Sequence, residues 1–244
     1  MFTEGLQKLD FSAENDIPIY TDSKGMHWLM FGEITEFRVR TMYTKEPETI
    51  SWIDYFESDS VLFDIGANIG LYSIYAASQR NSKVYSFEPS VYSGYILARN
   101  ILANNLNNKI VASTIAVSPK NDLTFIDITQ SIGAGNNQIL ENGTNLVSGF
   151  DLNYILNSGT IDFPNYIKID IDGLDFAVLK SAGKHLKDPR LKSVLIEVDE
   201  SIPNLSNDVV DFMKTMNFPQ VIKRHYPYFD KYHYAPIFNY IFYR

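Results

Sequence analysis

Residues 61–73 read VLFDIGANIGLYS, and this stretch decides the fold. A short apolar run at 61–65 stops at Gly66, which is typical of a buried strand that ends in a tight turn. Apolar residues from 69 to 78 then follow a helical period. A strand, a glycine-containing turn and a helix in this order predict the first unit of a doubly wound α/β fold.

The same alternation continues toward the C-terminus. The pattern predicts strands at 83–87, 109–117, 123–128, 166–171, 191–198, 220–223 and 236–243, and helices at 91–105, 174–182 and 205–216. Repeated β-α units imply a mostly parallel sheet with helices on both faces. We expect seven of the eight predicted strands to belong to this sheet. Ligands on such sheets bind outside the carboxyl ends of the strands, so the residues just after each strand are the candidates for function.

On the N-terminal side, residues 26–30 and 35–42 are rich in aromatic and β-branched residues and predict short strands. Glu46-Pro47-Glu48-Thr49 opens a predicted helix at 50–56. We therefore divide the chain into an N-terminal β/α extension, 1–58, packed on a main domain, 59–244.

Composition excludes several classes of protein. The chain has 244 residues and no cysteine, which excludes disulfide scaffolds, cysteine nucleophiles and thiolate metal sites. Its net charge of −8 disfavours nucleic acid as a partner, because phosphate contacts need clustered Lys and Arg. We find neither a basic, then apolar, leader nor an apolar run long enough for a transmembrane segment, and expect a cytoplasmic protein.

The turn after the first strand predicts a cofactor site. Gly66 can adopt backbone angles closed to other residues and lets a ligand approach the main chain, and Gly70 lets the helix pack close to the strand. A dinucleotide site prefers Gly-x-Gly-x-x-Gly, where the helix N-terminus holds a pyrophosphate. Here Asp64 precedes the turn, and a carboxylate suits a cationic ligand without phosphate. S-adenosylmethionine fits, and we expect it to contact Asp64, Gly66, Ala67, Asn68 and Gly70.

A second carboxylate, Glu88, ends the next strand in the sequence Phe87-Glu88-Pro89. Doubly wound folds place an acidic residue there, about 20 residues after the glycine turn, to accept the two ribose hydroxyls. The plainer interpretation is an exposed Glu before a helix-starting proline. Because both motifs follow consecutive strands, we assign Glu88 and Pro89 to an adenosine-type ligand.

Two further strand ends carry acidic residues. Asp170 and Asp172 lie at the end of the strand at 166–171 and, two residues apart, can point to one face. They predict binding of the methionine end, a general base or a metal ligand. Asp172-Gly173 could instead cap the following helix. Glu197 interrupts an apolar strand, and either faces the acceptor or pairs with Lys168 on the neighbouring strand.

The candidate catalytic residues are Asp170, His225 and Glu197. The last strand of such folds runs antiparallel, so residues 224–234 would emerge on the cofactor side and bring His225 near the cleft; the alternative is an exposed His225 beside aromatic packing. Asp170 is our preferred base.

We expect no metal, because 174–178 offers only Asp175, on the helix surface, as an additional ligand. Residues 131–145, rich in Gly and Asn, predict either a flap or a plain surface excursion.

Together these segments resemble the FkbM-type methyltransferase family. The resemblance spans roughly residues 45 to 200 and is carried by 45–49 (KEPET) with 52–54, 61–73, 85–89 (YSFEP), Asn100 and Asn104 with Leu106, 167–173 (IKIDIDG), 178–182 (VLKSA) and 195–198 (LIEV). It implies S-adenosylmethionine-dependent methyl transfer, mostly to oxygen, often on sugars or natural products. Asp175 stands where the family usually has Glu, and Ser181 where it usually has Gly.

We therefore expect an O-methyltransferase whose acceptor is a hydroxyl of a sugar, glycan or natural product. One alternative is an NAD(P)-dependent Rossmann oxidoreductase, which shares the acidic residue after the second strand but needs the Gly-x-Gly turn that this chain lacks. Another is a non-catalytic ligand-binding protein on the same fold, since a fold does not imply a function.

Overall fold

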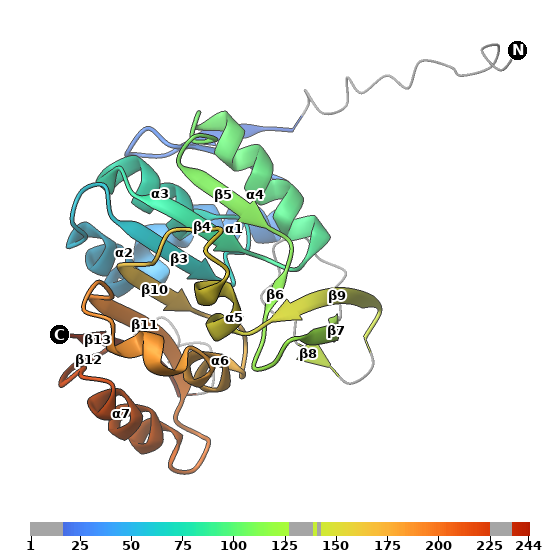
Figure 1. Ribbon diagram of the computed structural model, residues 1–244. Helices are drawn as coiled ribbons and strands as arrows, with labels where there is room; N and C mark the ends of the chain where they lie inside the picture. The colour runs from blue at the N-terminus through green and yellow to red at the C-terminus, as the bar shows by residue number, and fades with distance from the viewer. Residues whose placement is uncertain (1–16, 127–138, 141–142, 225–235) are drawn as a thin grey trace, which may run out of the picture.

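The computed structural model of the chain describes residues 17–126, 139–140, 143–224 and 236–244 (Figure 1). Its centre is a seven-stranded sheet in the order β12-β13-β11-β10-β3-β4-β5. The strands are β3 (Val61–Ile65), β4 (Lys83–Phe87), β5 (Ile110–Ser113), β10 (Tyr166–Ile169), β11 (Ser193–Asp199), β12 (Gln220–Arg224) and β13 (Ile237–Tyr243). Only β13 runs antiparallel to its neighbours within this sheet, so the predicted doubly wound, mostly parallel fold is confirmed.

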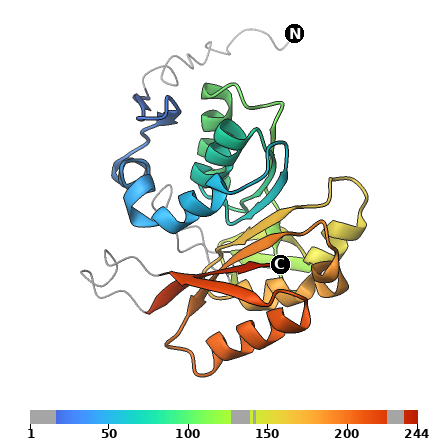
Figure 2. The ribbon, with the colours of Figure 1, turned by 90° about the vertical axis from the view of Figure 1, so that its left-hand side faces the viewer.

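Helices cover both faces of the sheet (Figure 2). One face carries α1 (Glu33–Lys45), α2 (Pro47–Asp54), α3 (Leu71–Arg80) and α4 (Val91–Ala103); the other carries α5 (Leu152–Asn157), α6 (Asp175–Ser181), the 3₁₀ helix η2 (Gly183–Lys187) and α7 (Leu205–Thr215). Successive strand residues point to opposite faces, so Leu62 packs in the first core with Ile74 of α3, and Phe63 in the second with Val178 of α6.

The N-terminal extension differs from its predicted form. A hairpin of β1 (Ile19–Thr21) and β2 (His27–Leu29) leads into α1, so the predicted strand at 35–42 is wrong. The buried residues of this segment are Thr35, Val39 and Met42, and their spacing of four and three is that of a helix facing the core. The β-branched side chains were therefore a misleading signal.

A second sheet, in the order β6-β9-β7-β8, lies beyond the end of β5. Its strands are β6 (Ala116–Val117), β7 (Asp122–Ile126), β8 (Ile139–Leu140) and β9 (Asn145–Phe150). The predicted single strand at 109–117 is therefore split between two sheets. Within the predicted flap, 139–140 and residue 145 belong to paired strands, whereas 131–138 and 141–142 lie outside the described residues.

The candidate site is the carboxyl edge of the sheet at β3 and β10, where the strand order reverses. From β3 the chain proceeds outward to β4 and β5, and β10 begins the other half. Because β13 is antiparallel, β12 ends at Arg224 and β13 begins at Ile237 on this same edge. His225, which follows β12 directly, lies outside the described residues.

Candidate functional site

The turn after β3 is held tightly against its neighbours. Gly66 and Ala67 donate their backbone N–H groups to the carbonyl of Phe87 at 3.0 and 3.1 Å, which fixes the turn to the end of β4. Gly66 has φ +80°, and a Cβ there would lie 1.9 Å from the carbonyl oxygen of Asp170. A glycine is thus needed at position 66 so that the turn can adopt this backbone angle and pack against the end of β10. Gly70, with φ +90°, gives room to Leu97 of α4 rather than to the strand.

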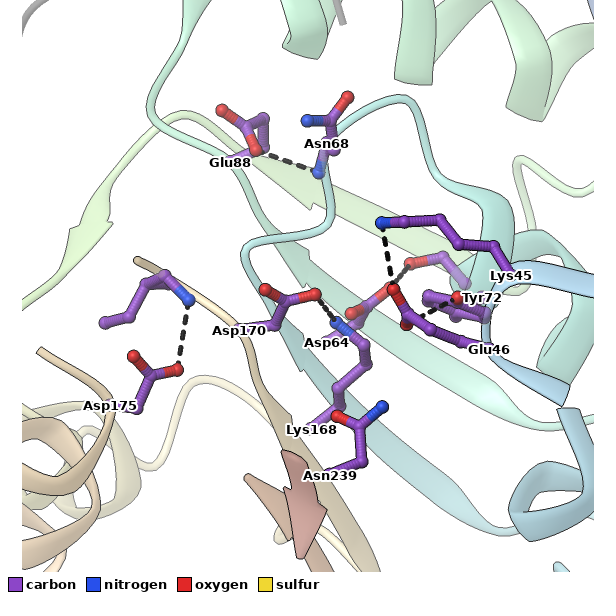
Figure 3. Close-up of polar contacts among 12 residues, drawn as sticks. Lys45, Glu46, Asp64, Asn68, Tyr72, Glu88, Lys168, Asp170, Asp175 and Asn239 are labelled. Atoms are coloured by element: carbon purple, nitrogen blue, oxygen red, sulfur yellow. Dashed lines mark hydrogen bonds and ion pairs between the residues drawn. The ribbon is translucent and has the colours of Figure 1, made fainter. Parts of the chain in front are cut away.

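Glu88 lies across this turn and is buried, with 4% of its surface exposed, so it is not the exposed residue of the plainer interpretation. Its carboxylate accepts the backbone N–H of Asn68 at 2.8 Å and that of Ser90 at 2.9 Å (Figure 3). Burial raises the pKa of Glu88 to about 7, although the two N–H groups partly oppose this. Pro89 does not start the helix, because Ser90 is the N-cap residue and α4 begins at Val91.

Asp64 is a buried carboxylate, with 1% of its surface exposed. Its Oδ2 accepts a hydrogen bond from Ser73 of α3, and Ser73 in turn lies 2.7 Å from the hydroxyl of Ser86 on β4. Its Oδ1 has no hydrogen-bond partner among the described residues. Burial raises the pKa of Asp64, and the nearby Lys168 opposes that shift.

Polar side chains from five adjacent strands share the face of the sheet that α2 and α3 cover. In strand register Ser86 lies opposite Asp64 and Asp64 opposite Lys168; one pleat further, Glu197 lies opposite Asn239. Side chains in register point to the same face. With Asp170, two residues after Lys168, they form what we call the polar row: Ser86, Asp64, Lys168, Asp170, Glu197 and Asn239.

Lys168 and Asp170 form the central ion pair of the polar row, with Nζ and Oδ2 2.7 Å apart. Burial is the largest single influence and would raise the pKa of Asp170, but the charge and hydrogen bond of Lys168, together with the charges of Lys45 and Arg38, lower it. Asp170 is therefore ionised at neutral pH. Among the described residues Lys168 pairs with Asp170 and not with Glu197, so of the two alternatives for Glu197 the pair with Lys168 does not form.

Asp172 lies in the turn after β10, and Asp175 is the first residue of α6. The strand ends at Ile169, two residues earlier than predicted, and Asp172 has φ +56°, so strand alternation does not place it beside Asp170. Asp175 is 5% exposed, and its carboxylate accepts the N–H groups of Ile171 and Gly173. It holds the turn in place and does not lie on the helix surface as expected. Burial raises the pKa of each carboxyl to about 6.

Glu197 has a strongly raised pKa, first through burial and then through the charges of Asp170 and Glu46. Its register partner Asn239 donates a hydrogen bond to Glu48 at 2.8 Å. Asn239 is a polar residue in an apolar strand, which is the same signal that singled out Glu197.

The junction of α1 and α2 closes the site from the N-terminal side. Glu46 is 6% exposed and accepts hydrogen bonds from the Tyr72 hydroxyl at 2.7 Å and from Lys45 at 3.1 Å (Figure 3). The sequence reasoning assigned no site role to these three residues or to Glu48. Nothing in the local pattern shows that they lie beside β10.

Comparison with known proteins now identifies the family. The model of the methyltransferase FkbM domain matches residues 64–220, more than half of the chain. The chain belongs to the FkbM methyltransferase family. It is therefore an S-adenosylmethionine-dependent methyltransferase, and the oxidoreductase interpretation falls away.

A curated relative and two solved structures agree with this family. The hexuronic acid methyltransferase AglP of Haloferax volcanii is 20% identical over 166 residues, which cover 68% of this chain and 67% of the relative. A putative rRNA methylase from Clostridium thermocellum superposes with a TM-score of 0.51 at 10% identity, covering 82% of this chain and 94% of that one. An rRNA methylase from Streptococcus thermophilus superposes with a TM-score of 0.50 at 11% identity, covering 81% of this chain and 94% of that one. At such identities the two structures show the fold alone.

The residues at the carboxyl edge fit S-adenosylmethionine. Carboxylates suit its hydroxyls and amino group, and the buried Oδ1 of Asp64 leaves an acceptor without a donor among the described residues. The cofactor brings the activated methyl group; the protein supplies binding and orientation. In the described part of the chain no three His, Asp or Glu side chains gather as a metal site, and no helix is both long and apolar enough to cross a membrane. Metal independence stays a prediction.

Proposed function

We propose that this enzyme methylates a hydroxyl oxygen of a sugar, a glycan or a natural product. The polar row carries the proposal, because its two partly exposed members, Asp170 and Glu197, place carboxylates at the cofactor edge, and carboxylates accept hydrogen bonds from hydroxyl groups. The curated relative that acts on a hexuronic acid supports the same acceptor class. Carboxylates outnumber cations along the row, which disfavours a phosphate backbone as acceptor.

Three parts of the edge would hold the cofactor. We assign the turn from Gly66 to Gly70 to main-chain contact, Glu88 with Pro89 to the adenosine, and Asp64 with Asp170 to the cationic methionine end. The supporting observations are the burial of Glu88 against the turn and the ionised state of Asp170.

The acceptor hydroxyl must lose a proton during methyl transfer, and the candidate recipients are Asp170, Glu197 and His225. A general base works best when its pKa lies near the working pH, and contributes about 10²–10⁴-fold. Lys168 lowers the pKa of Asp170, whereas burial and neighbouring carboxylates raise that of Glu197. The opposite directions of these two pKa shifts favour Glu197 over Asp170 as the base. Asp170 would then orient the cofactor. His225 keeps its candidacy from the sequence.

A mass-spectrometric acceptor screen tests the proposal. The enzyme is incubated with S-adenosylmethionine bearing a deuterated methyl group and with neutral sugars, uronic acids, glycans, phenolic natural products and RNA. We expect label on an oxygen of a carbohydrate or natural product, and none in a Glu88→Ala control. Label found only in RNA, or only on carbon or nitrogen, contradicts the proposal.

A further inference from the structure

Lys168 and Asp170 are buried to very different extents. The side chain of Lys168 is 2% exposed, whereas that of Asp170 is 31% exposed, and 2.7 Å separates their charged atoms. Lys168 is thus a buried cation that holds the more exposed carboxylate of Asp170 at the carboxyl edge of the sheet. Figure 3 shows Asp170 between Lys168 and the turn that leads to Asn68.

Groups from three other segments surround the ammonium group of Lys168. Its Nζ lies 5.1 Å from the centre of the Tyr72 ring, and Tyr72 is held by Glu46. Asp64 stands opposite Lys168 in strand register. Burial of an isolated ammonium group is costly, so these contacts are needed to keep Lys168 charged at this position. They also fix where it can place Asp170.

A purely structural role for Lys168 would be to neutralise Asp64 inside the protein. The hydrogen bonds argue for more than that. Among the described residues Asp64 takes its hydrogen bond from Ser73, and Lys168 gives its own to Asp170. Lys168 therefore donates its hydrogen bond to Asp170, the more exposed of the two carboxylates.

We propose that Lys168 is a positioning residue of the methyl-transfer site, which holds Asp170 ionised and in place as counter-ion to the positively charged end of S-adenosylmethionine. This inference rests on the cofactor role of Asp170 in the proposed function. Lys168 itself acts through Asp170 and needs no contact with the cofactor.

The charged surroundings of Asp170 predict what happens without Lys168. The other nearby cations are Arg38 and Lys45 on α1, and the nearby carboxylates are Asp64, Asp172, Asp175 and Glu197. With Lys168 replaced by Met, burial and these carboxylates dominate, and the pKa of Asp170 rises. Asp170 then takes up a proton at mildly acidic pH and no longer balances a cation.

Calorimetric titration with S-adenosylhomocysteine, which keeps the amino group, measures this effect without any acceptor. The proteins are wild type, Lys168→Met, Asp170→Asn and the double variant, from about pH 5.5 to 8.5. We expect the ratio of the Kd of Lys168→Met to that of wild type to grow toward acid, by up to about tenfold per pH unit. In the Asp170→Asn background, Lys168→Met should change the Kd by less than about twofold.

Control variants separate positioning from general damage. Lys83→Met removes an ion pair of the same 2.7 Å length, to Asp162, at the opposite edge of the sheet, and should leave the Kd unchanged. Lys168→Arg keeps the positive charge and should restore a pH-independent ratio. If Lys168→Met does not fold, the uncharged Lys168→Gln takes its place, with the same growth of the Kd ratio toward acid expected.

Two results would overturn the proposal, and they differ from each other. A ratio independent of pH, or the same loss with and without Asp170, makes Lys168 a structural residue only. An unchanged Kd in Asp170→Asn removes Asp170 from the cofactor site, and with it the premise taken from the proposed function.

Discussion

Gly66 shows how a single residue shapes the cofactor turn. Its φ of +80° is shared almost identically by Gly25, at +82°, yet a Cβ on Gly66 would meet the Asp170 carbonyl at 1.9 Å while one on Gly25 would meet nothing within 4 Å. Alanine substitutions at these two glycines therefore separate the cost of backbone strain from the cost of a steric clash.

Gly25→Ala should cost about 1–2 kcal/mol of unfolding free energy through its left-handed backbone alone. Gly66→Ala should cost about 1–3 kcal/mol more, because the turn must move away from β10, and it should also weaken S-adenosylhomocysteine binding. Urea denaturation and calorimetry measure the two effects. Equal destabilisation by both substitutions would contradict the packing role of Gly66.

Glu88 gives cofactor binding a pH dependence. Its pKa in the folded protein is about 7, above the ordinary value of 4.5, so the free protein holds a proton there below neutral pH. Ribose hydroxyls donate best to the ionised form, and binding should therefore release a proton below about pH 7. By the same linkage, the raised pKa makes the free protein more stable in acid and less stable as the pH rises from 4.5 through 7.

Titration of S-adenosylhomocysteine in two buffers of different ionisation enthalpy should reveal this proton near pH 6.5, about half a unit below the pKa. Glu88→Gln should bind more weakly and release none there. Identical proton release by both proteins would remove Glu88 from the ribose site.

At the scale of elements, Asn100 of α4 connects the N-terminal hairpin to the cofactor turn. Its side chain is fully buried, accepts the N–H of Leu29 on β2 and donates to the carbonyl of Ile69 in the turn. Asn104, one helical turn later, forms hydrogen bonds with His27 of the same hairpin and with Asn100, and none with the turn among the described residues.

Asn100→Ala should therefore loosen both the hairpin and the turn, at about 1–3 kcal/mol for each buried group left unsatisfied. Asn104→Ala should loosen the hairpin alone. Hydrogen exchange of β2 should rise in both variants, whereas S-adenosylhomocysteine affinity should fall only in Asn100→Ala. A similar affinity loss in both variants would argue against direct support of the turn by Asn100.

Elements with a single clear period were predictable from sequence. β3 and β4 match their predicted bounds residue for residue, because apolar runs in buried parallel strands end at recognisable turns. α1 was mistaken for a strand because β-branched residues outweighed its helical spacing. The short β8 and β9 and helix α5 were missed, although Asp151, which caps α5 by accepting the N–H of Tyr154, carried a readable signal.

The site divides in the same way. Glu88 and Asp170 were singled out because they directly follow strands, and Asp64 and Glu197 because they are carboxylates inside apolar strands; their roles remain predictions. The contribution of the α1–α2 junction to the site was not predicted, because it depends on contacts such as that of Glu48 with Asn239, 191 positions apart in sequence. No periodicity encodes such a pairing.

At the scale of the whole molecule, the extension and the main domain share one hydrophobic core. Trp28 and Trp52 of the extension lie in the same cluster as Leu62 and Leu195 of the sheet. Trp52 also donates a hydrogen bond to Ser193 of β11 at 2.9 Å. A shared core of this kind predicts that both parts unfold together.

The two tryptophans are the only ones in the chain, so their fluorescence reports on the extension, while far-ultraviolet circular dichroism reports mainly on the sheet and its helices. We expect the two denaturation curves to coincide. Fluorescence that changes at a lower denaturant concentration than circular dichroism would mean that the extension unfolds independently.

A crystal structure with S-adenosylhomocysteine tests the central claim most directly. We predict the ligand at the carboxyl edge of β3, β4 and β10, with its ribose hydroxyls on Glu88, its backbone contacts at the turn from Gly66 to Gly70, and its amino group toward Asp170. Density for the ligand elsewhere, or with its ribose directed away from Glu88, would contradict this account.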